Sequence, residues 1–488
     1  MYFLGIDFGG GSSKATLIDE KGNIVATAKT EYDTHYGEGG SVTQKPDDWY
    51  YAAINNIKTI LSTGIDPKQI ATLCFDAATH TAVILDKDNN VIDDSIYWTD
   101  TRSIKEKQYL LENYKDYIFE KTKHYPDTIW TLPELMFFKN EKPELFKKIA
   151  HVLFAKDYVR FKFCPSGYQT DYIEAEGSMM FGFDENKWDE KLLSIVGLSQ
   201  DVMPSILKPL DVVGFISQEA ASESGLSTST KVLVGSTDTA MEVFSSGGVK
   251  TGDLSIKLAT AGRIYMVSNK PVPDKNIINY AHLDGVHYYP GSATKSCAAS
   301  SRWFRDNFGG DFQDLNEMAE SVSLGSDGLI FHPYLNGELT PFASPTIRGS
   351  FFGLSAMHTK AHFARSLYEG VAFSMLDCLL YLKEHGLDLP NQAFVIGGGS
   401  KSPIWLRILS DVLNMKLIVT KENDSSFGSA LCGAISNGCY RDFEEAINKT
   451  QIIVSEVTPI KENNDKYLEI YKNYQKISQF TLDYYNVK

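Results

Sequence analysis

The sequence lacks paired cysteines, a long apolar run and an excess of basic residues. Its six cysteines are scattered without a CxxC pair, which favours reduced thiols over disulfides or a zinc site. No segment approaches the roughly 20 apolar residues that a transmembrane helix needs. The first residues show no basic region followed by an apolar stretch, so no signal peptide is predicted. We therefore expect a cytoplasmic protein that does not bind membranes.

Positive charge is scarce. The chain has 62 acidic residues against 47 Lys and Arg residues, which gives a net charge of −15. Such a surface disfavours nonspecific binding to nucleic acid, and we expect no nucleic-acid partner. A small anionic ligand is not excluded, because local backbone N–H groups decide its binding.

The length of 488 residues exceeds what one hydrophobic core usually serves, so two large domains are expected. The chain opens on short apolar runs that predict a β-meander, followed by a helix that starts near Pro46 and ends near Gly64. After Gly247 and Gly248, a second hairpin-like pair resembles the first. Two halves that each open on strands and then carry helices predict a duplicated α/β architecture, divided into domains 1–247 and 248–488.

Three loops of small residues each follow a predicted strand. They are GGGSSK (9–14), ATAG (259–262) and GGGSKS (397–402). Glycine-rich turns expose backbone N–H groups that can hold phosphate. Neither glycine loop fits the pattern GxxxxGK[ST], and GxGxxG fails at its last position, which is Lys14 in one loop and Ser402 in the other. A lone glycine cluster is as often a plain hairpin turn, so the pattern alone leaves both interpretations open.

Two aspartates, Asp7 and Asp238, stand near the ends of apolar strands. A carboxylate beside a phosphate site can hold Mg²⁺ directly or through water. The alternatives are a turn-capping role for Asp7 and a helix N-cap for Asp238.

The sequence resembles the FGGY carbohydrate kinases, and among them most closely the xylulokinase-like members. The resemblance covers nearly the whole chain as an ordered set of segments, among them GIDFGGGSSKATLIDEKGNIVA, GSVTQKPDDWY, YWTDTRS, GSTDTA, LATAG, HPYLNGELTPFASPTIRGSFFGL and GGGSKSPIWLRILSDVLN. It implies the α/β, ribonuclease H-like fold of the actin/hexokinase/Hsp70 ATPases. Two domains, each a mixed sheet flanked by helices, would place the active site in the cleft between them.

The resemblance also implies a role for each matching residue. Asp238 would be the catalytic base that accepts the proton of the sugar hydroxyl, and Asp7 would lie at the metal. The substrate-binding residues would be His80, Thr79 and Thr239. The phosphate- and ATP-binding residues would be Gly10, Gly11, Ser12, Ser13, Lys14, Thr260, Gly262, Gly398, Gly399 and Ser402. The implied ligands are ATP, Mg²⁺ and a small sugar, and homodimers are frequent in this family.

Several matching residues have structural explanations as well. A histidine at a strand end, such as His80, is often a satisfied structural residue. Trp405 is expected to be a buried core aromatic, and Gly428 lies in a small-residue helix that the resemblance places at the adenine pocket. Asp100 and Arg102 are expected to form a local ion pair.

The departures from the family pattern concern the substrate. The usual QMHG is ATHT from Ala78 to Thr81, SDAS is IEAE from Ile173 to Glu176, and GERTP has Leu339 in place of arginine; the first glycine loop has Gly10 and Gly11 where threonines are usual. Sites that recognise hydroxyls by hydrogen bonds discriminate strongly, so such changes can switch the sugar. The predicted activity is ATP-dependent phosphorylation of a ketopentose, first D-xylulose to D-xylulose 5-phosphate. Ribulose, L-xylulose, gluconate and a tetritol are alternative substrates, and a nonenzymatic sugar sensor is the alternative class.

Overall fold

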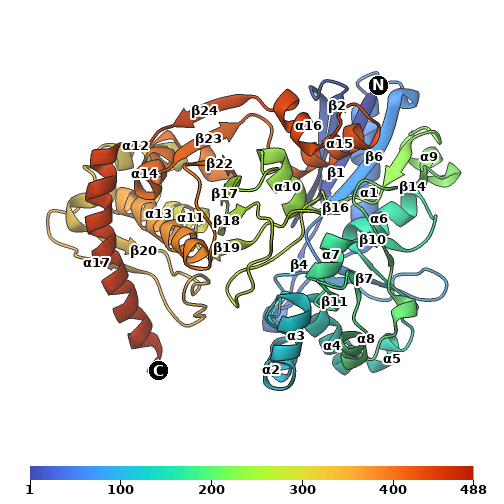
Figure 1. The fold of residues 1–488 in the computed structure, drawn as a ribbon, viewed down its shortest axis with the longest axis horizontal. Helices are drawn as coiled ribbons and strands as arrows, with labels where there is room; N and C mark the ends of the chain where they lie inside the picture. The colour runs from blue at the N-terminus through green and yellow to red at the C-terminus, as the bar shows by residue number, and fades with distance from the viewer. Residues whose placement is uncertain (487–488) are drawn as a thin grey trace. The chain divides into compact units, whose positions relative to one another are not determined.

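The computed structural model describes residues 1–486, and its contacts divide the chain into two units (Figure 1). The first unit comprises Met1–Ser245, Tyr280–Tyr288 and Glu422–Thr450, and the second comprises Ser246–Asn279, Tyr289–Lys421 and the chain from Gln451 onward. The first boundary between the units lies two residues from the predicted division after residue 247. The two later segments that join the first unit have no counterpart in that division, which stays a prediction.

The first unit is built on a seven-stranded sheet in the order β14-β15-β6-β1-β2-β3, with β16 also paired to β6. The strands are β1 (Tyr2–Phe8), β2 (Ser12–Asp19), β3 (Ile24–Glu31), β6 (Ile70–Ala77), β14 (Val212–Phe215), β15 (Lys231–Leu233) and β16 (Ser236–Thr237). Helices α1 (Pro46–Leu61) and α6 (Ala155–Phe163) pack on the sheet, and α15 (Ser425–Ser436) packs on β1, β2 and β6. Because both faces are covered, β1 is apolar along most of its length.

Smaller elements surround this sheet. Three short strands, β4 (His35–Tyr36), β5 (Val42–Gln44) and β8 (Ser95–Ile96), form one small sheet. Three further pairs are β7 (Ala82–Leu85) with β9 (His151–Phe154), β10 (Gln169–Asp171) with β13 (Ser205–Leu207), and β11 (Phe181–Gly182) with β12 (Lys187–Trp188). The other helices are α2 (Ile104–Asn113), α3 (Lys115–Thr122), α4 (Thr131–Glu141), α5 (Pro143–Phe146), α7 (Tyr172–Gly177), α8 (Glu190–Val196), α9 (Gln218–Ser224), α10 (Asp238–Ser246) and α16 (Phe443–Thr450).

The second unit is built on a six-stranded sheet in the order β19-β18-β17-β22-β23-β24. The strands are β17 (Leu254–Leu258), β18 (Gly262–Met266), β19 (Gly291–Thr294), β22 (Gln392–Ile396), β23 (Lys416–Thr420) and β24 (Ile453–Val457). Its helices are α11 (Ala298–Phe308), α12 (Phe312–Glu320), α13 (Lys360–Glu384), α14 (Pro403–Leu413) and α17 (Lys461–Asn486), and β20 (Ile330–His332) pairs with β21 (Ser350–Phe352). The long helix α13 is buried along most of its length and forms much of this core.

The two main sheets share one topology. From β3 to β14 the successive pairings are antiparallel, antiparallel, parallel, parallel and antiparallel, and the same series runs from β19 to β24. The predicted duplication is therefore confirmed. The hairpin turn between β1 and β2 corresponds to the turn between β17 and β18, so GGGSSK and ATAG occupy equivalent places in the two sheets.

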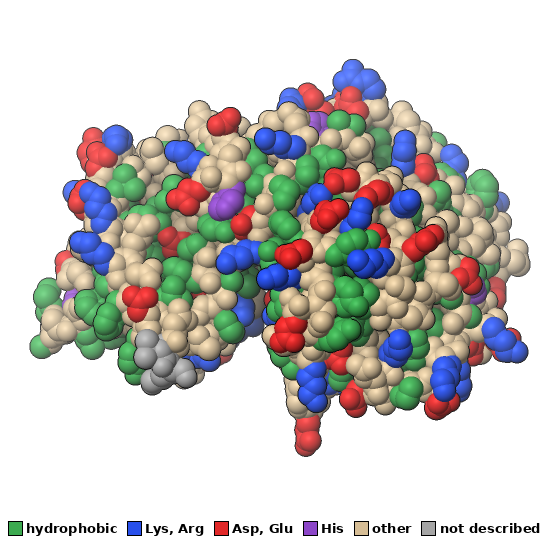
Figure 2. All heavy atoms as spheres, turned by 60° about the horizontal axis from the view of Figure 1, so that its bottom comes forward, with side chains coloured by type: hydrophobic (Ala, Val, Ile, Leu, Met, Phe, Trp, Pro, Cys, Tyr) green, Lys and Arg blue, Asp and Glu red, His purple; other side chains and the backbone are tan. Residues whose placement is uncertain are grey.

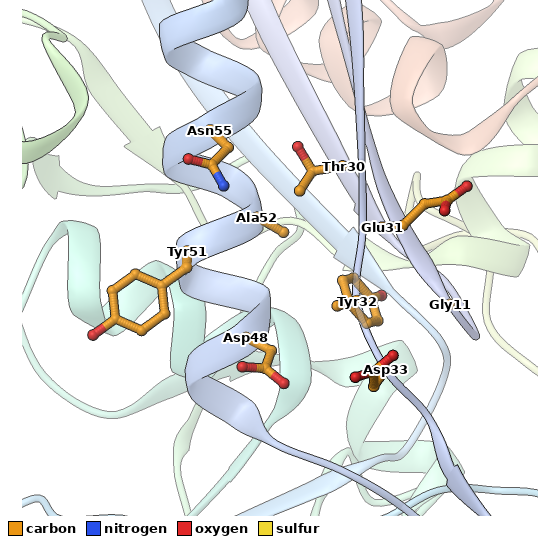
Figure 3. A pocket seen from close by; sticks show the side chains of 9 residues that line it. All are labelled: Gly11, Thr30, Glu31, Tyr32, Asp33, Asp48, Tyr51, Ala52 and Asn55. Carbon is orange, nitrogen blue, oxygen red and sulfur yellow. The ribbon is translucent and has the colours of Figure 1, made fainter.

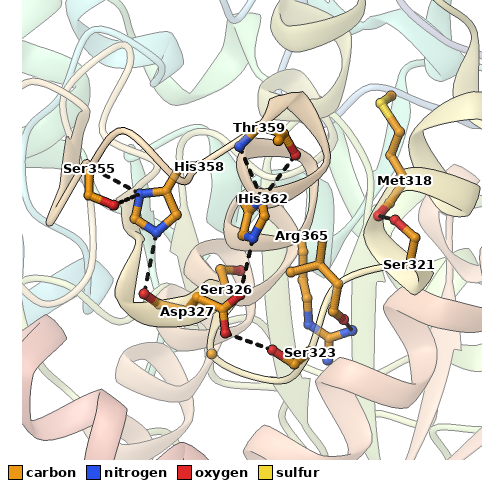
Figure 4. Close-up of polar contacts among 12 residues, drawn as sticks. Met318, Ser321, Ser323, Ser326, Asp327, Ser355, His358, Thr359, His362 and Arg365 are labelled. Carbon is orange, nitrogen blue, oxygen red and sulfur yellow. Dashed lines mark hydrogen bonds and ion pairs between the residues drawn. The ribbon is translucent and has the colours of Figure 1, made fainter.

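A tight turn is pinned to the start of α13 (Figure 4). Ser326 and Asp327 both have positive φ, which costs free energy for residues other than glycine. The Asp327 carboxylate lies 3.1 Å from Nε2 of His362, and Ser326 donates to Glu369 at 2.8 Å. Glu369 in turn pairs with Arg365 at 2.8 Å, so the first three turns of α13 hold the strained turn in place.

The burial of Asp377 on α13 is expected to make the free energy of unfolding depend on pH. Its carboxylate accepts a hydrogen bond from the Tyr471 hydroxyl on α17, and burial raises the pKa of Asp377 to about 7 despite that bond. An acid whose pKa is higher in the folded state stabilises the fold while protonated, so stability is lost as the pH rises from about 4 to about 7. Asp377→Asn keeps the oxygen that accepts from Tyr471 but cannot ionise.

The expected result is a smaller fall in the unfolding midpoint between pH 5 and pH 8 for Asp377→Asn than for the wild type. Thermal unfolding of both proteins in the two buffers measures it. Parallel pH profiles for the two proteins would show that Asp377 is already ionised below pH 5 in the folded protein.

Charged side chains of both signs are interspersed on the face of the molecule shown in Figure 2. The absence of a nucleic-acid partner stays a prediction. Among residues 1–486, no helix combines the length and the apolar character that crossing a membrane requires.

Candidate active site

Three carboxylates meet at the ends of three neighbouring strands of the first unit. Asp7 on β1 is the register partner of Asp76 on β6, and Ser236 on β16 is the partner of Asp76 on its other side. Asp238 follows β16 directly and is the first residue of α10. Because these strands run parallel, their carboxyl ends share one edge of the sheet, where ligands of open α/β sheets commonly bind.

Asp238 is partly exposed, and its hydrogen bonds are concentrated on one oxygen. The Oδ1 atom accepts from the N–H of Thr239 at 2.6 Å, from the Thr239 hydroxyl at 3.2 Å and from the Thr79 hydroxyl at 3.3 Å. No hydrogen bond from residues 1–486 ends on its Oδ2. The arrangement fixes the carboxylate by one oxygen and leaves the other without a hydrogen-bond donor among the described residues.

Asp7 and Asp76 form a tightly coupled pair. Asp76 is fully buried, and its Oδ2 accepts from the Ser429 hydroxyl on α15 at 2.5 Å. Burial raises the pKa of Asp7 to about 7, and burial together with the charge of Asp7 raises the pKa of Asp76. Neighbouring buried carboxyls resist ionising together unless a cation neutralises them.

The carboxylates fit a cation that a nucleotide brings with it. Among residues 1–486, no group of three or more His, Cys, Asp or Glu side chains forms a metal site by itself. Mg²⁺ in nucleotide-binding enzymes usually takes only one or two carboxylates, with phosphate oxygens and water completing its shell. The Oδ1 atoms of Asp7 and Asp76 are buried and accept no hydrogen bond, so both can serve as such ligands.

The turn between β1 and β2 is closed and anchored by its neighbours. Gly9 donates to the carbonyl of Ser12 at 3.1 Å, which closes the turn around Gly10 and Gly11. The hydroxyls of Tyr32 and Thr34 donate to the carbonyls of Gly9 and Gly10, each at 2.5 Å. The Gly9 N–H is used in closing the turn, whereas the N–H groups of Gly10 and Gly11 donate to no backbone carbonyl among residues 1–486 and could hold a phosphate.

Alternation along β2 separates the side chains of the predicted phosphate residues. Ser13 is fully buried, and its hydroxyl accepts from Asn56 of α1 at 3.1 Å. Lys14 faces the opposite side of the sheet and pairs with Asp424, the N-cap residue of α15. In this conformation Ser13 offers a phosphate only its backbone, and the charge of Lys14 is already matched, while the roles predicted for both residues remain predictions.

Thr79 and His80 follow β6, and the buried carboxyl group of Glu174 holds the backbone of His80. His80 has a φ of 56°, its N–H donates to Glu174 of α7, and its carbonyl accepts from the Thr131 hydroxyl at 2.7 Å. The histidine ring is only 5% exposed and packs against Trp130. A left-handed backbone at a non-glycine residue is typical of functional sites, where surrounding bonds stabilise it.

A buried charge network lies behind α7. Lys156 Nζ is 2.6 Å from Asp157 Oδ1 and 3.0 Å from Asp171 Oδ2, and all three side chains are fully buried. Asp171 is the N-cap of α7 and also accepts from the Ser236 hydroxyl at 2.9 Å. The network therefore ties α6, α7 and the strand before Asp238 together.

The predicted ion pair between Asp100 and Arg102 is confirmed. Arg102 Nη2 lies 2.8 Å from Asp100 Oδ2, and the same oxygen accepts from the N–H of Val42 at 2.8 Å. The pair fixes the turn that follows β8.

In the second unit, the ATAG turn is bonded to the start of α11. The carbonyl of Thr260 accepts from the N–H groups of Cys297 at 3.0 Å and Ala299 at 3.2 Å. The exposed Arg302 on α11 donates from Nη2 to the Thr260 hydroxyl at 3.2 Å. Gly262 begins β18, and a Cβ there would stand 2.5 Å from Met375 Sδ, so that glycine is required by packing.

The GGGSKS loop lies against the end of β17. A Cβ at Gly399 would stand 2.7 Å from Leu258 Cβ and 2.9 Å from Trp405 Cζ3, whereas Gly398 has open space around it. Trp405 is buried and stacks on Tyr368 at 4.7 Å, which confirms the expectation of a core aromatic. Ser402 caps α14 and donates to Asn316 at 2.7 Å.

The small-residue helix α15 packs in the first unit. A Cβ at Gly428 would stand 2.5 Å from the Met241 carbonyl of α10, so the two helices touch closely there. The adenine contact predicted for this helix is not tested by that packing.

A hollow of about 410 Å³ lies between α1 and the end of β3 (Figure 3). Gly11 and Tyr32 form part of its wall, together with Glu31, Asp33 and Asp48. Its acidic side chains disfavour an anion inside the hollow.

Sequence reasoning missed two side chains of this arrangement. Asp76 stands at the end of an apolar run, just as Asp7 and Asp238 do, so its position was a usable signal. Arg302 carried no local signal, because its contact with Thr260 depends on how α11 packs on the turn.

Comparison with known proteins agrees with these features. Residues 2–245 match the N-terminal domain of the FGGY family of carbohydrate kinases, and residues 259–437 match its C-terminal domain. The xylulose kinase of Bacillus subtilis is 29% identical over 490 residues, covering 99% of this chain and 97% of that protein. The gluconokinase of the same species is 28% identical, with 96% and 93% covered. The crystal structure of a xylulose kinase from Lactobacillus acidophilus shares the fold, with a TM-score of 0.93 at 24% identity and 99% of each chain covered.

Proposed function

The chain belongs to the FGGY family of carbohydrate kinases, and from that premise we propose that it transfers the γ-phosphate of ATP to D-xylulose. The meeting of Asp7, Asp76 and Asp238 at one sheet edge carries the proposal. One position suits a base, and the other two suit the cation that accompanies a nucleotide. The expected product is D-xylulose 5-phosphate.

Asp238 is proposed as the general base. Its Oδ2 would accept the proton of the sugar hydroxyl as that oxygen attacks phosphorus, while the bonds to Oδ1 hold the carboxylate in place. Such a base contributes about 10²–10⁴-fold to the rate. Alignment of the reactants and neutralisation of phosphate charge supply the remainder.

Phosphate binding is proposed for Gly10, Gly11 and Ser12 of the first unit and, separately, for Thr260 of the second, because their turns are equivalent in the two sheets. Gly398, Gly399 and Ser402 are proposed to lie at the adenosine. Asp7 and Asp76 would hold Mg²⁺, which neutralises phosphate charge when bound. The roles of the loop residues and of Asp7 rest on the match to the family motifs, and that of Asp76 rests on its register with Asp7 and its buried Oδ1 atom.

D-Xylulose is proposed ahead of gluconate for an electrostatic reason. Relatives of both names match this chain at similar identity, so identity alone does not choose between them. The Asp238 carboxylate accepts from Thr79, whereas burial raises the pKa of Glu174 beside His80 and favours its neutral form. The carboxylate of Asp238 at this segment disfavours an anionic substrate such as gluconate and suits a neutral ketose.

A substrate panel tests the choice. ADP release is measured with D-xylulose, L-xylulose, ribulose, gluconate and a tetritol at equal concentrations. We expect the largest kcat/KM for D-xylulose. A larger value for gluconate would overturn the substrate proposal, and no turnover with any sugar would overturn the kinase assignment.

Arg302 is expected to contribute to ATP binding, because its guanidinium lies beside Thr260 and remains exposed. Arg302→Gln should raise the KM for ATP by about tenfold, in keeping with one charge-assisted hydrogen bond, and leave the KM for the sugar unchanged. Arg305→Gln is the matched control, since Arg305 lies on the same helix and pairs with Asp306 at 2.7 Å. Equal KM values for ATP in the two variants would exclude the role.

A further inference from the structure

Gly10 is a glycine that its own backbone does not require. It does not adopt a positive φ, so an ordinary residue could take its conformation. A Cβ at this position would, however, stand 3.0 Å from Tyr97 Oη and 3.7 Å from Tyr97 Cζ. At the neighbouring Gly11, a Cβ would meet no atom within 4 Å. The space at Gly10 is therefore occupied by the hydroxyl of Tyr97.

Tyr97 is held rigidly just after β8. Its N–H donates to the Val42 carbonyl at 2.9 Å, and its carbonyl accepts from the N–H of Asp100 at 2.7 Å. The ring packs with Val42, Ala78 and Trp98 and is 8% exposed. Both ends of the residue are fixed, so the hydroxyl has a defined direction.

The same small sheet anchors the glycine turn. Gln44 on β5 donates to the Thr34 hydroxyl at 2.7 Å, and Thr34 donates to the Gly10 carbonyl at 2.5 Å. The turn and the tyrosine thus share one support, formed by β4, β5 and β8. Their distance is set by this support and not by a flexible side chain.

Tyr97 lies near Asp238 and Asp7, the carboxylates proposed to take part in the reaction. It packs on Ala78, which directly precedes Thr79, the donor to Asp238. Burial and the charges of Asp238 and Asp7 raise the pKa of Tyr97 above its usual range. The phenol therefore stays protonated at neutral pH and is a hydrogen-bond donor.

We propose that the Tyr97 hydroxyl donates a hydrogen bond to the γ-phosphate of ATP at the Gly9–Gly11 turn. The inference rests on the proposed function, which places phosphates at this turn. Of the two serines after the glycines, Ser13 turns its hydroxyl into the core, which leaves Ser12 as the partly exposed one. Tyr97 adds a second side-chain donor from a different element, and Gly10 leaves room for it.

Nucleotide binding without sugar tests the proposal. Binding of ADP and of the nonhydrolysable ATP analogue AMP-PNP is measured by calorimetry for the wild type, Tyr97→Phe and Tyr36→Phe. Tyr97→Phe should weaken the binding of AMP-PNP about tenfold or more and the binding of ADP much less, because only AMP-PNP carries a γ-phosphate. Tyr36 is the control, since it lies on β4 and is 78% exposed.

Gly10→Ser perturbs the same hydroxyl by crowding it. The serine Cβ would stand 3.0 Å from Tyr97 Oη, so the substitution should weaken the binding of AMP-PNP when Tyr97 is present. In the Tyr97→Phe background the nearest ring atom is 3.7 Å away, and the serine should weaken binding less or restore it. Non-additive effects of this sign support a shared phosphate contact.

Additive effects, or equal losses for ADP and AMP-PNP in Tyr97→Phe, would overturn the proposal. Nucleotide binding without phosphorylation of any sugar would overturn the proposed function and leave the Tyr97 result interpretable. Failure of the wild type to bind either nucleotide would overturn both.

Discussion

Asp238→Asn is expected to lower kcat by about 10²–10⁴-fold with little change in the KM for ATP. The asparagine cannot accept the proton of the sugar hydroxyl. Its side-chain oxygen still accepts from the Thr239 N–H, so the start of α10 should be preserved. The effect corresponds to a loss of about 3–5 kcal/mol of transition-state stabilisation. ADP release with D-xylulose, measured over a range of both substrates, gives kcat and both KM values.

Asp311→Asn is the matched control for this substitution. Asp311 also begins a helix and accepts from the N–H groups of Gln313 and Asp314, and asparagine is an equally good N-cap. The control should keep wild-type turnover. Comparable kcat values for Asp238→Asn and the wild type would show that another group takes the proton.

Lys156→Met is expected to destabilise the first unit by about 3–5 kcal/mol. Removing the ammonium group leaves Asp157 and Asp171 buried without their shared cation, and the loss of an ion partner costs more than the pair contributes. Burial alone would lower the pKa of Lys156, but the charges of Asp157, Asp171 and Glu174 raise it, so the lysine is charged in the fold. The expected fall in the unfolding midpoint is on the order of 10 °C.

Lys162→Met provides the comparison on the same helix. Lys162 is exposed and lies over the ring of Tyr50, so its loss should change stability by less than about 0.5 kcal/mol. Differential scanning calorimetry of the three proteins measures the effect. A midpoint for Lys156→Met that matches the control would mean that the buried network is relaxed or hydrated in solution.

The duplicated fold could be predicted because its signals are local. The β-meanders, the turns between their strands and the helices that follow are visible in alternation and in glycine placement. The order of the strands was not predictable residue by residue, because it depends on pairing between distant segments. The helix α15, which comes late in the chain but packs in the first unit, is one such case. Gly5 permits that packing, since a Cβ there would collide with the Ser426 carbonyl, but a single glycine in a strand does not show which segment packs against it.

The residues of the candidate site likewise fall into those predicted from local sequence and those that depend on the folded structure. Asp7 and Asp238 were predicted because each ends an apolar strand and matches a family segment. Asp76 also ends an apolar strand, but only the strand register places it beside Asp7. Tyr97 became visible through the space it occupies at Gly10. Ser13 and Lys14 lie in the predicted loop, but alternation along β2 directs one side chain to α1 and the other to Asp424. Motifs identify a segment, whereas side-chain direction depends on the sheet that contains it.

Transfer of a labelled phosphate tests the central claim most directly. The protein is incubated with ATP labelled in its γ-phosphate, Mg²⁺ and D-xylulose, and the products are separated. The account predicts label on C5 of the sugar, at a rate that exceeds release of inorganic phosphate, and no transfer without sugar. Label found only in inorganic phosphate, with or without any sugar of the panel, would contradict it.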